Sequence, residues 1–232
     1  EGRSWRRSVY EPYKMNRDAS REALTLKEQE EDEMFWEAYN ELLDYLDTKT
    51  NCSVLQENDS EADDLIARWI HNHQDNNHVI VSSDSDFYQL INDNVSMYNG
   101  IANQHITING VYDDTGKIVM DKKTNAPKTI PSPAYSLFEK CVRGDTSDNI
   151  FSAYPGCRKK GTRNKVGMLE AYADKENGGF SWNNFMLQVW TDHNGEEHTV
   201  RDDFERNVQL IDLTAQPMDL KVKFVETIAE NS

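Results

Sequence analysis

The segment from residue 79 to residue 87 constrains the fold more than any other part of this chain. It begins with three β-branched residues, Val79-Ile80-Val81, which predict a short strand buried on both faces of a parallel sheet. Two carboxylates, Asp84 and Asp86, follow one residue apart, and they point into the same space if the chain stays extended. Ligands of open α/β sheets bind beyond the carboxyl ends of strands. The segment therefore predicts a metal site at a sheet edge, although Asp and Ser are also typical of surface turns.

A second acidic group, Glu61-Ala62-Asp63-Asp64, opens a predicted helix. The expected N-cap is Asp59 or Ser60, and the expected buried side chains are Leu65, Ile66, Trp69 and Ile70. The helix dipole alone favours acidic residues in a first turn, but three carboxylates in four residues exceed what capping requires. Because this helix leads into the strand at 79–81, a parallel return would bring both acidic groups to one sheet edge.

A third acidic group follows a predicted helix that runs from Pro133 to Val142. Gly144 stops this helix, and Asp145 and Asp148 face the same way if the following turn stays helical. Glycines and basic residues then fill positions 154–162, just before a helix predicted at 165–173. Backbone N–H groups in such a loop can approach phosphates closely.

The net charge of −16 argues against a nucleic-acid partner for the chain as a whole. The basic residues, however, gather in two segments. Residues 1–21 hold six basic and three acidic residues, and residues 156–165 hold five basic residues and no acid. In the first segment the bases alternate with Trp5, Tyr10 and Tyr13, which suits a single-stranded nucleic acid. For any one run, a solvated surface is the simpler interpretation.

Periodicity predicts the rest of the chain. We expect a helix over 20–46, a strand over 52–56, β-hairpins over 95–130, and mostly helix over 178–232 around a polar loop at 191–199, with no further site. The apolar stripe of the first helix is expected to be core; it consists of Met34, Phe35, Tyr39, Leu42, Leu43 and Leu46. The polar stretch 124–133 is the expected boundary between two lobes.

Composition excludes several classes. No apolar run approaches membrane-spanning length, and no signal-peptide pattern opens the chain. Three widely spaced cysteines indicate a reducing compartment without structural disulfides. The six histidines lack regular ligand spacing and are expected to be surface or core residues, and the adjacent His71-Asn72-His73 does not match the dispersed pattern of the nuclease class with those letters.

Four stretches in this order resemble the 5′-nuclease superfamily of flap endonucleases, polymerase-linked 5′→3′ exonucleases and, most closely, phage-type ribonuclease H enzymes. They are Trp5-Arg6-Arg7 through Tyr13-Lys14-Met15-Asn16-Arg17, Glu61-Ala62-Asp63-Asp64, Ser83-Asp84-Ser85-Asp86-Phe87 and Gly144-Asp145-Thr146-Ser147-Asp148-Asn149. Each signature alone is weak in so acidic a chain, but four in the family's order are strong.

The resemblance implies an α/β fold with a mostly parallel central sheet and helices on both faces, a PIN-like 5′-nuclease core. It also implies a C-terminal helical subdomain with a helix-three-turn-helix. The core would take residues 1–130, with a helical-arch segment at about 1–30, and the duplex-binding subdomain residues 131–232. The family's upstream strand–helix–strand unit, with its own aspartates, is missing before Glu1, so we expect a fragment or a second polypeptide. Cys157-Arg158 replaces the family's usual small apolar residue and glycine.

The resemblance also implies a metal site. Carboxylate ligands without Cys or His favour hard cations, so we expect two Mg²⁺ ions, with Mn²⁺ as a substitute. The expected metal ligands are Glu61, Asp63, Asp64, Asp84, Asp86, Asp145 and Asp148, with Asp64 alternatively bracing its helix. The expected catalytic residues are Lys14, Arg17, Asp63, Asp84 and Asp86. The expected nucleic-acid contacts are Arg6, Arg7, Lys14, Arg17, Arg158, Lys159 and Lys160.

The expected function is a metal-dependent, structure-specific 5′→3′ nuclease that removes primers by cutting DNA flaps, nicked duplex or RNA–DNA hybrid. One alternative is a non-catalytic module that binds branched DNA or docks on a replication protein. Another is an acidic domain that buffers divalent ions, but no loop matches a calcium-hand pattern. We expect a monomer in the cytoplasm of a phage-infected bacterial cell, with a single-stranded-DNA-binding protein as a further partner and no membrane association.

Overall fold

The computed structural model describes residues 4–231. In chain order its elements are α1 (Arg6–Val9), α2 (Met15–Glu22), α3 (Leu26–Lys49), α4 (Ala62–Asn72), β1 (His78–Val81), the 3₁₀ helix η1 (Ser85–Leu90), β2 (Val95–Asn99), β3 (Gln104–Thr107), β4 (Gly110–Asp113), α5 (Pro133–Arg143), α6 (Met168–Ala173), α7 (Phe180–Met186), β5 (Val189–Thr191), β6 (Glu197–Thr199), α8 (Val200–Ile211) and α9 (Met218–Glu230). Within this range no helix is long and apolar enough to cross a membrane.

The main sheet is mixed, with four strands in the order β1-β2-β3-β4. Only β1 and β2 are parallel, whereas β2–β3 and β3–β4 are antiparallel. The expectation of a mostly parallel sheet is therefore wrong. The cause is the short connections after β2, because tight turns such as Ile108-Asn109 between β3 and β4 can join only antiparallel neighbours. The predicted hairpin around Asn109-Gly110 is present.

One face of this sheet is buried and the other is open. Ile80, Met97 and Ile106 point into a core that also contains Ala67 of α4 and Phe87 of η1. On the opposite face Val79 is 59% exposed and Val81 is 75% exposed. The predicted burial of β1 on both faces, with helices on both sides, is thus wrong for the described residues. Burial alternates along β1 as in a sheet with one solvated face.

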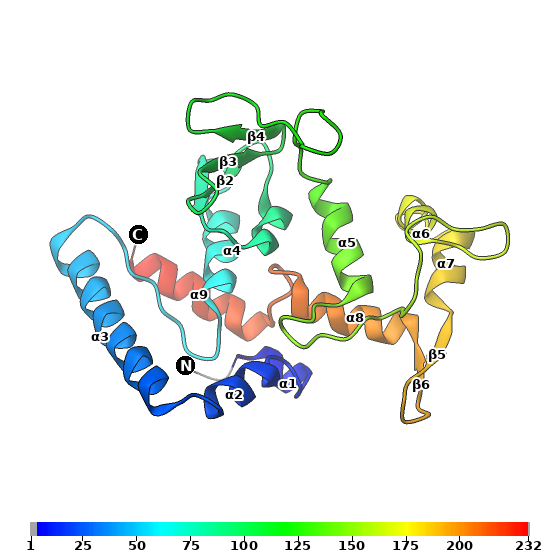
Figure 1. Ribbon diagram of the computed structural model, residues 1–232, viewed down its shortest axis with the longest axis horizontal. Coiled ribbons are helices and arrows are strands. Elements are labelled where there is room, and N and C mark those ends of the chain that lie inside the picture. The colour runs from blue at the N-terminus through cyan, green and yellow to red at the C-terminus, as the bar shows by residue number, and fades with distance from the viewer. Residues whose placement is uncertain (1–3, 232) are drawn as a thin grey trace.

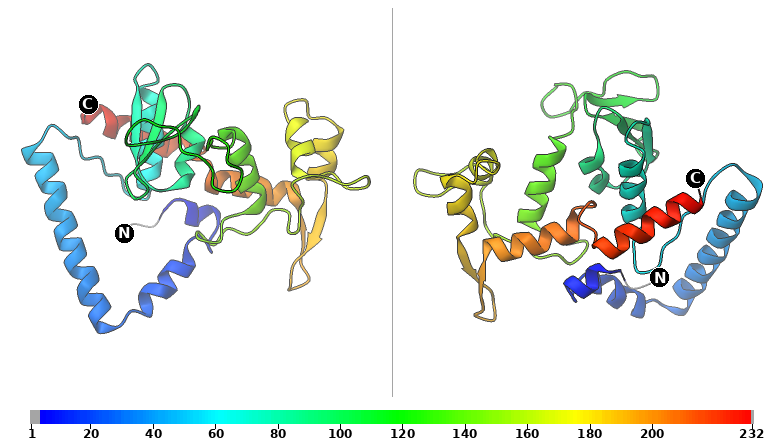
Figure 2. Two further views of the ribbon diagram at one scale, coloured as in Figure 1. Left: turned by 45° about the horizontal axis from the view of Figure 1, so that its top comes forward. Right: turned by 180° about the vertical axis from the view of Figure 1, so that it is seen from behind.

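Helices α2 and α3 form a hook at one side of the molecule (Figures 1 and 2). The helix expected over 20–46 is broken before Thr25, whose hydroxyl accepts a bond from the Glu28 N–H while the Glu28 carboxylate accepts one from the Thr25 N–H. This reciprocal capping starts α3 as a separate helix. No residue of α3 is buried, and Met34, Phe35 and Tyr39 are exposed, so the expected core role of its stripe is wrong. The strand expected at 52–56 is irregular backbone.

Helices α5, α6, α7 and α8 pack together around aromatic side chains. Phe138 of α5 lies within 6.3 Å, centroid to centroid, of Tyr172, Trp182, Phe185 and Phe204. Helix α6 starts at Met168, three residues after the predicted start, and the polar loop expected at 191–199 is the hairpin β5–β6.

The last helix returns to the first half of the chain. Leu220 and Phe224 of α9 pack with Trp5 and with Leu65 of α4. Figure 1 shows α9 crossing beneath α4, away from α6 and α7. The division into lobes near residue 130 stays a prediction, and any such division must assign α9 to the side of α4.

Candidate active site

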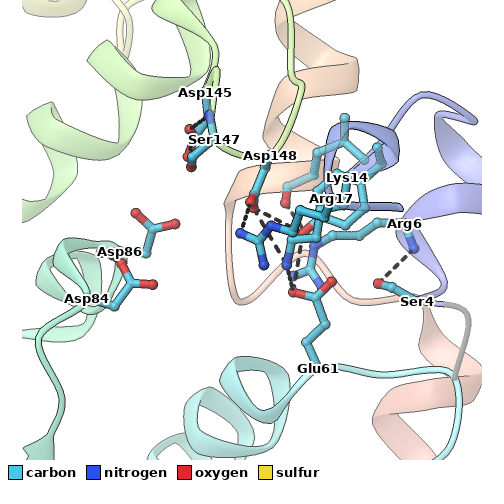
Figure 3. Close-up of polar contacts among 12 residues, drawn as sticks. Ser4, Arg6, Lys14, Arg17, Glu61, Asp84, Asp86, Asp145, Ser147 and Asp148 are labelled. Atoms are coloured by element: carbon cyan, nitrogen blue, oxygen red, sulfur yellow. Dashed lines mark hydrogen bonds and ion pairs between the residues drawn. The ribbon is translucent and has the colours of Figure 1, made fainter. Parts of the chain in front are cut away.

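The three acidic segments meet in one cleft of about 1530 Å³. Among its lining residues are six of the seven predicted carboxylates: Glu61, Asp63, Asp84, Asp86, Asp145 and Asp148. Figure 3 shows Asp84 and Asp86 on one side of the space and Glu61 and Asp148 on the other, beside Lys14 and Arg17. Side chains separated by more than eighty residues in the sequence thus share one solvent-filled space.

Glu61 stands at the N-cap of α4, in place of the predicted Asp59 or Ser60. Asp59 has a positive φ of 61°, which a turn residue adopts, and the chain enters the helix two residues later. The Asp64 carboxylate accepts a bond of 3.1 Å from the Glu61 N–H. Capping by Asp64 therefore holds Glu61 at the mouth of the cleft and turns Asp64 inward.

Asp64 does not reach the cleft. Its side chain is fully buried and accepts two bonds of 2.8 Å from the Arg6 guanidinium and one of 3.2 Å from the Trp5 indole N–H. These partners take up both oxygens, so the alternative of a bracing residue fits Asp64 and direct metal ligation does not.

Arg6 is also buried, and this burial contradicts the expectation that Arg6 contacts nucleic acid. It is 1% exposed, and its Nε–H donates to the Leu210 carbonyl at 2.8 Å. Burial lowers the pKa of Arg6, but the hydrogen bond to Asp64 and the nearby negative charges, that of Asp64 foremost, together outweigh burial, so the pKa is raised. Arg6 is a charged structural link between α1, α4 and α8.

Asp84 and Asp86 follow β1, as predicted. The Asp84 carboxylate accepts a bond of 2.9 Å from the Asp86 N–H and caps η1. The Asp86 carboxylate accepts a bond from the Lys140 ammonium, which also contacts Asp145 at 2.7 Å. Burial raises the pKa of Asp86 and outweighs the contact with Lys140. Burial opposes ionisation of Asp145 as well, but bonds from Lys140 and Ser147 lower the pKa of Asp145 to about 2.

Asp145 and Asp148 lie on a tight loop and face different neighbours, so they do not share one helical face. Gly144 makes the loop possible, because its φ is 74° and a Cβ there would lie 2.4 Å from the Ile150 carbonyl oxygen. Asp145 and Ile150 then exchange two backbone hydrogen bonds of 2.9 and 2.7 Å. Asp145 faces Lys140, whereas Asp148 faces the start of α2.

The opposite side of the cleft is built on the turn before α2. Lys14 adopts a left-handed φ of 57° and donates its N–H to the Asp148 carbonyl at 2.9 Å. Its ammonium lies 2.6 Å from Glu61 and 3.7 Å from Asp148, and Arg17 lies 2.6 Å from Asp148. The buried Tyr13 hydroxyl lies 3.2 Å from Glu61 and 3.3 Å from Asp148. Burial raises the pKa of Glu61, but Lys14 reverses this, so the pKa is lowered.

Asp63 lies between these two groups. Within residues 4–231 its carboxylate makes no hydrogen bond or ion pair. Burial, and then the charges of Glu61 and Asp84, raise the pKa of Asp63 to about 6. A half-buried carboxylate flanked by like charges is stabilised by a bound cation. Because the charged ligand atoms that line the cleft are carboxylate oxygens and its lining includes no His or Cys among the residues that the structure describes, the residues present fit a hard divalent ion such as Mg²⁺ or Mn²⁺.

The other predicted basic residues lie in two places. Arg7 lines the cleft and pairs with Asp18 at 2.6 Å. Arg158, Lys159 and Lys160 are exposed on the loop before α6 and do not line the cleft. That loop is held by Glu170, whose carboxylate accepts the N–H groups of Gly161 and Gly167 at 2.9 and 3.1 Å.

Sequence reasoning did not single out Lys140 or Trp36, and it did not place Tyr13 or Tyr39 among the carboxylates, yet all four residues line the cleft. Lys140 had a detectable signal, since it stands in the last turn of a predicted helix, five residues before Asp145. Tyr39 belongs to the predicted apolar stripe and Trp36 does not, but a periodic pattern does not show what faces a helix.

An acidic cleft with lysine and arginine at its edge, set in an α/β fold, is the arrangement found in proteins that use divalent cations to act on phosphates. The family model for the 5′-3′ exonuclease N-terminal resolvase-like domain matches residues 1–116, half of the chain. The chain therefore belongs to this family, within the 5′-nuclease superfamily indicated by its motifs.

Similar proteins agree with this assignment. DNA polymerase I of Rhizobium leguminosarum is 27% identical over 174 residues, which are 74% of this chain and only 14% of that protein. A bacteriophage T5 protein co-crystallised with metal ions is 20% identical, with a TM-score of 0.67 over all of this chain and 83% of that one. A bacteriophage T5 flap endonuclease in a pseudo-enzyme–product complex with DNA and metal ions is 20% identical and gives 0.65 over 99% and 80% of the two chains. These structures share the fold of this chain.

Proposed function

We propose that this chain is a divalent-metal-dependent nuclease that hydrolyses phosphodiesters at the 5′ end of flapped or nicked DNA, and of RNA–DNA hybrids during primer removal. The observation that carries the proposal is the gathering of six carboxylates from three distant segments into one cleft beside Lys14 and Arg17. Membership of the 5′-3′ exonuclease family supports it, as does the relative that is a DNA polymerase.

Glu61, Asp63, Asp84, Asp86, Asp145 and Asp148 would hold the divalent cations, for which we propose two Mg²⁺ ions. Bound divalent cations supply positive charge at the phosphoryl oxygens and lower the pKa of an attacking water. Lys14 and Arg17 now neutralise Glu61 and Asp148, and a phosphate that enters the cleft would compete for their N–H groups. The Tyr13 hydroxyl, which lies within hydrogen-bond distance of both carboxylates, helps to hold Glu61 and Asp148 in place.

The surroundings of the cleft suit a branched substrate. Trp36 and Tyr39 of α3 line it and offer aromatic faces on which bases of a single-stranded 5′ end can stack. Lys159 and Lys160, on the separate loop before α6, would hold the duplex by its phosphates, as the proposed helix-three-turn-helix requires, and read shape without sequence.

The test uses labelled 5′-flap, nicked duplex and RNA–DNA substrates with Mg²⁺, Mn²⁺ or EDTA. Asp84→Asn and Asp86→Asn should each slow cleavage more than about a hundredfold, since several kcal/mol of charge stabilisation depend on the metal, while DNA affinity stays within about threefold. Asp114→Asn, at an exposed turn, is the matched control.

Two results would contradict the proposal. Cleavage by the unaltered chain that persists in EDTA would remove the role of the metal. Tight binding of flapped DNA without cleavage in either Mg²⁺ or Mn²⁺ would favour the alternative of a non-catalytic branched-DNA-binding module.

A further inference from the structure

A second group of metal-ligand side chains lies in the hairpin β5–β6. Asp192, Glu196 and His198 each offer one ligand atom, and these atoms lie within 4.8 Å of one another. None of the three lines the acidic cleft. Figures 1 and 2 show the hairpin at the opposite end of the molecule from α3. Whatever this group binds is therefore separate from the proposed nuclease site.

The imidazole of His198 is the observation that distinguishes this group from an ordinary acidic turn. Its Nε2 is buried and has no hydrogen-bond partner among residues 4–231. The nearest carboxylate oxygen, Oδ2 of Asp192, is 3.8 Å away, too far for a hydrogen bond. A ring nitrogen that has neither a partner nor access to water is costly. The His198 side chain as a whole is 28% exposed, and its Nε2 lies on the side of the Asp192 carboxylate.

The other ring nitrogen is already oriented. Nδ1 of His198 lies 3.4 Å from Oδ2 of Asp203, a buried carboxylate that also accepts bonds from Trp190 Nε1 at 3.2 Å and Arg206 Nη1 at 2.6 Å. This neighbour favours the tautomer with the proton on Nδ1, which leaves the Nε2 lone pair free. Metal-bound histidines are commonly oriented by a carboxylate in this way. Trp190 stacks on the ring at 4.4 Å and fixes its plane.

The hairpin turn arranges the two carboxylates. Oδ1 of Asp192 accepts the N–H groups of Asn194 at 2.8 Å and Glu196 at 2.9 Å, and the positive φ of Gly195, 86°, closes the turn. Oδ2 of Asp192 has only a weak contact of 3.3 Å with the Asn194 amide. Glu196 is exposed and free to swing toward it.

We propose that Asp192, Glu196 and His198 form a zinc-class site that closes the turn of the β5–β6 hairpin, since all three ligands lie within residues 192–198. One imidazole nitrogen with two carboxylate oxygens suits Zn²⁺, whereas Mg²⁺ prefers oxygen ligands in octahedral geometry. Ligands about 2.1 Å from zinc at tetrahedral angles lie about 3.4 Å apart. The pair at 3.8 Å therefore has to close only slightly, and a water molecule completes the fourth position.

The test is a Zn²⁺ titration of the full chain by calorimetry, in excess Mg²⁺ so that the acidic cleft is occupied. His198→Gln and Glu196→Gln should remove one zinc equivalent or weaken it at least tenfold. His193→Gln is the matched control, because His193 is exposed in the same turn and outside the group, and it should keep that equivalent. Asp84→Asn should keep it too.

Nuclear magnetic resonance of the unaltered chain gives an independent readout that does not depend on how the variants fold. Zinc should shift the ¹⁵N resonance of His198 Nε2 while Nδ1 stays protonated. An unchanged resonance, or equal zinc binding by the His198→Gln and unaltered chains, overturns the proposal. Equal loss in His193→Gln also overturns it, because binding would then belong to exposed histidines in general.

Discussion

Asp63 and Asp64 are neighbours in the sequence, yet their carboxylates meet opposite surroundings. Asp64 is buried against the Arg6 guanidinium, with both oxygens bonded. Asp63 lies near Glu61 and Asp84, and burial with these like charges outweighs the opposing charges of Lys14 and Arg6. Aspartate therefore stabilises the fold at position 64, where it is part of a structural ion pair. At position 63 it destabilises the metal-free fold, as expected for a residue of a cation-binding site.

The first prediction is that Asp63→Asn stabilises the metal-free chain at neutral pH. The folded pKa of Asp63, about 6, is above its ordinary 3.8. Ionised Asp63 thus penalises the folded state fully above pH 6, and the penalty vanishes as pH falls through 3.8. A shift of about 2 pKa units corresponds to about 3 kcal/mol.

Thermal unfolding in EDTA measures this effect. The gain from Asp63→Asn should be present at about pH 7.5 and absent near pH 4, and Asp114→Asn should show no such pH dependence. A variant that is less stable than the unaltered chain at neutral pH would show that Asp63 has an unrecognised partner. With saturating Mg²⁺ the order should reverse, because only the unaltered site gains stability from the ion.

The second prediction concerns Asp64. Asp64→Ala leaves the Arg6 guanidinium buried without its carboxylate and should cost about 3–5 kcal/mol of unfolding free energy, measured by urea denaturation. The double change Arg6→Met with Asp64→Leu removes both charges and should recover much of that loss. If Asp64→Ala instead costs less than about 1 kcal/mol but abolishes metal binding, Asp64 is a ligand after all.

Sequence motifs predicted six of the carboxylates that line the cleft, but not the direction in which each side chain points. Glu61, Asp84 and Asp148 stand in signatures that can be found by inspection, and they line the cleft. The buried role of Asp64 depends on Arg6, which lies 58 residues away and was assigned to nucleic acid because of its charge. A charge pattern carries no information about burial, and only the packing of α1 on α4 and α8 decides it.

At the scale of elements, the sequence patterns predicted several helices and strands correctly, but they did not predict which faces of these elements are buried. The strand at 79–81 and the helices at 62–72 and 133–143 formed close to the expected residues. The same β-branched run, however, fits an edge strand with one open face as well as a central one. The stripe on α3 has helical period, but no other element covers it, so periodicity predicted the helix correctly and its core role wrongly.

The third prediction follows from that exposed helix. Trp36→Ala with Tyr39→Ala should change the unfolding free energy by less than about 0.5 kcal/mol, because no residue of α3 is buried. The affinity for DNA with a single-stranded 5′ flap should fall by roughly 1–3 kcal/mol per stacked base. Urea denaturation measures the unfolding free energy, and fluorescence anisotropy with flapped and blunt duplexes measures the affinity for each kind of DNA.

Tyr45→Ala is the control for this change, since Tyr45 is exposed on the same helix but does not line the cleft. Its affinity for flapped DNA should match that of the unaltered chain. Equal weakening of flapped and blunt duplex by the Trp36 and Tyr39 changes would place those rings on the duplex, not on the single strand.

At the scale of the whole molecule, the proposed function requires a chain of net charge −16 to bind a polyanion through local positive regions. The structure separates these regions. Lys14 and Arg17 stand at the cleft among the carboxylates, whereas Lys159 and Lys160 extend from the loop before α6, outside it. Binding at two places would orient a substrate across the molecule. Hydrolysis would take place in the cleft, and the distant loop would set the position of the duplex.

The last prediction tests the separate roles of the cleft and the loop before α6 through the salt dependence of DNA affinity. Lys159→Ala with Lys160→Ala removes two phosphate contacts, so the slope of log affinity against log salt should become shallower by about 1.8 units on duplex-containing substrates. The loss should be the same for all sequences, because phosphates carry no sequence information. Lys122→Ala with Lys123→Ala removes the same charge from another exposed loop and should leave the slope unchanged. A single-stranded oligonucleotide should bind both variants alike, since it engages the cleft. If the Lys122 and Lys123 changes flatten the slope equally, net charge and not the loop before α6 governs DNA binding.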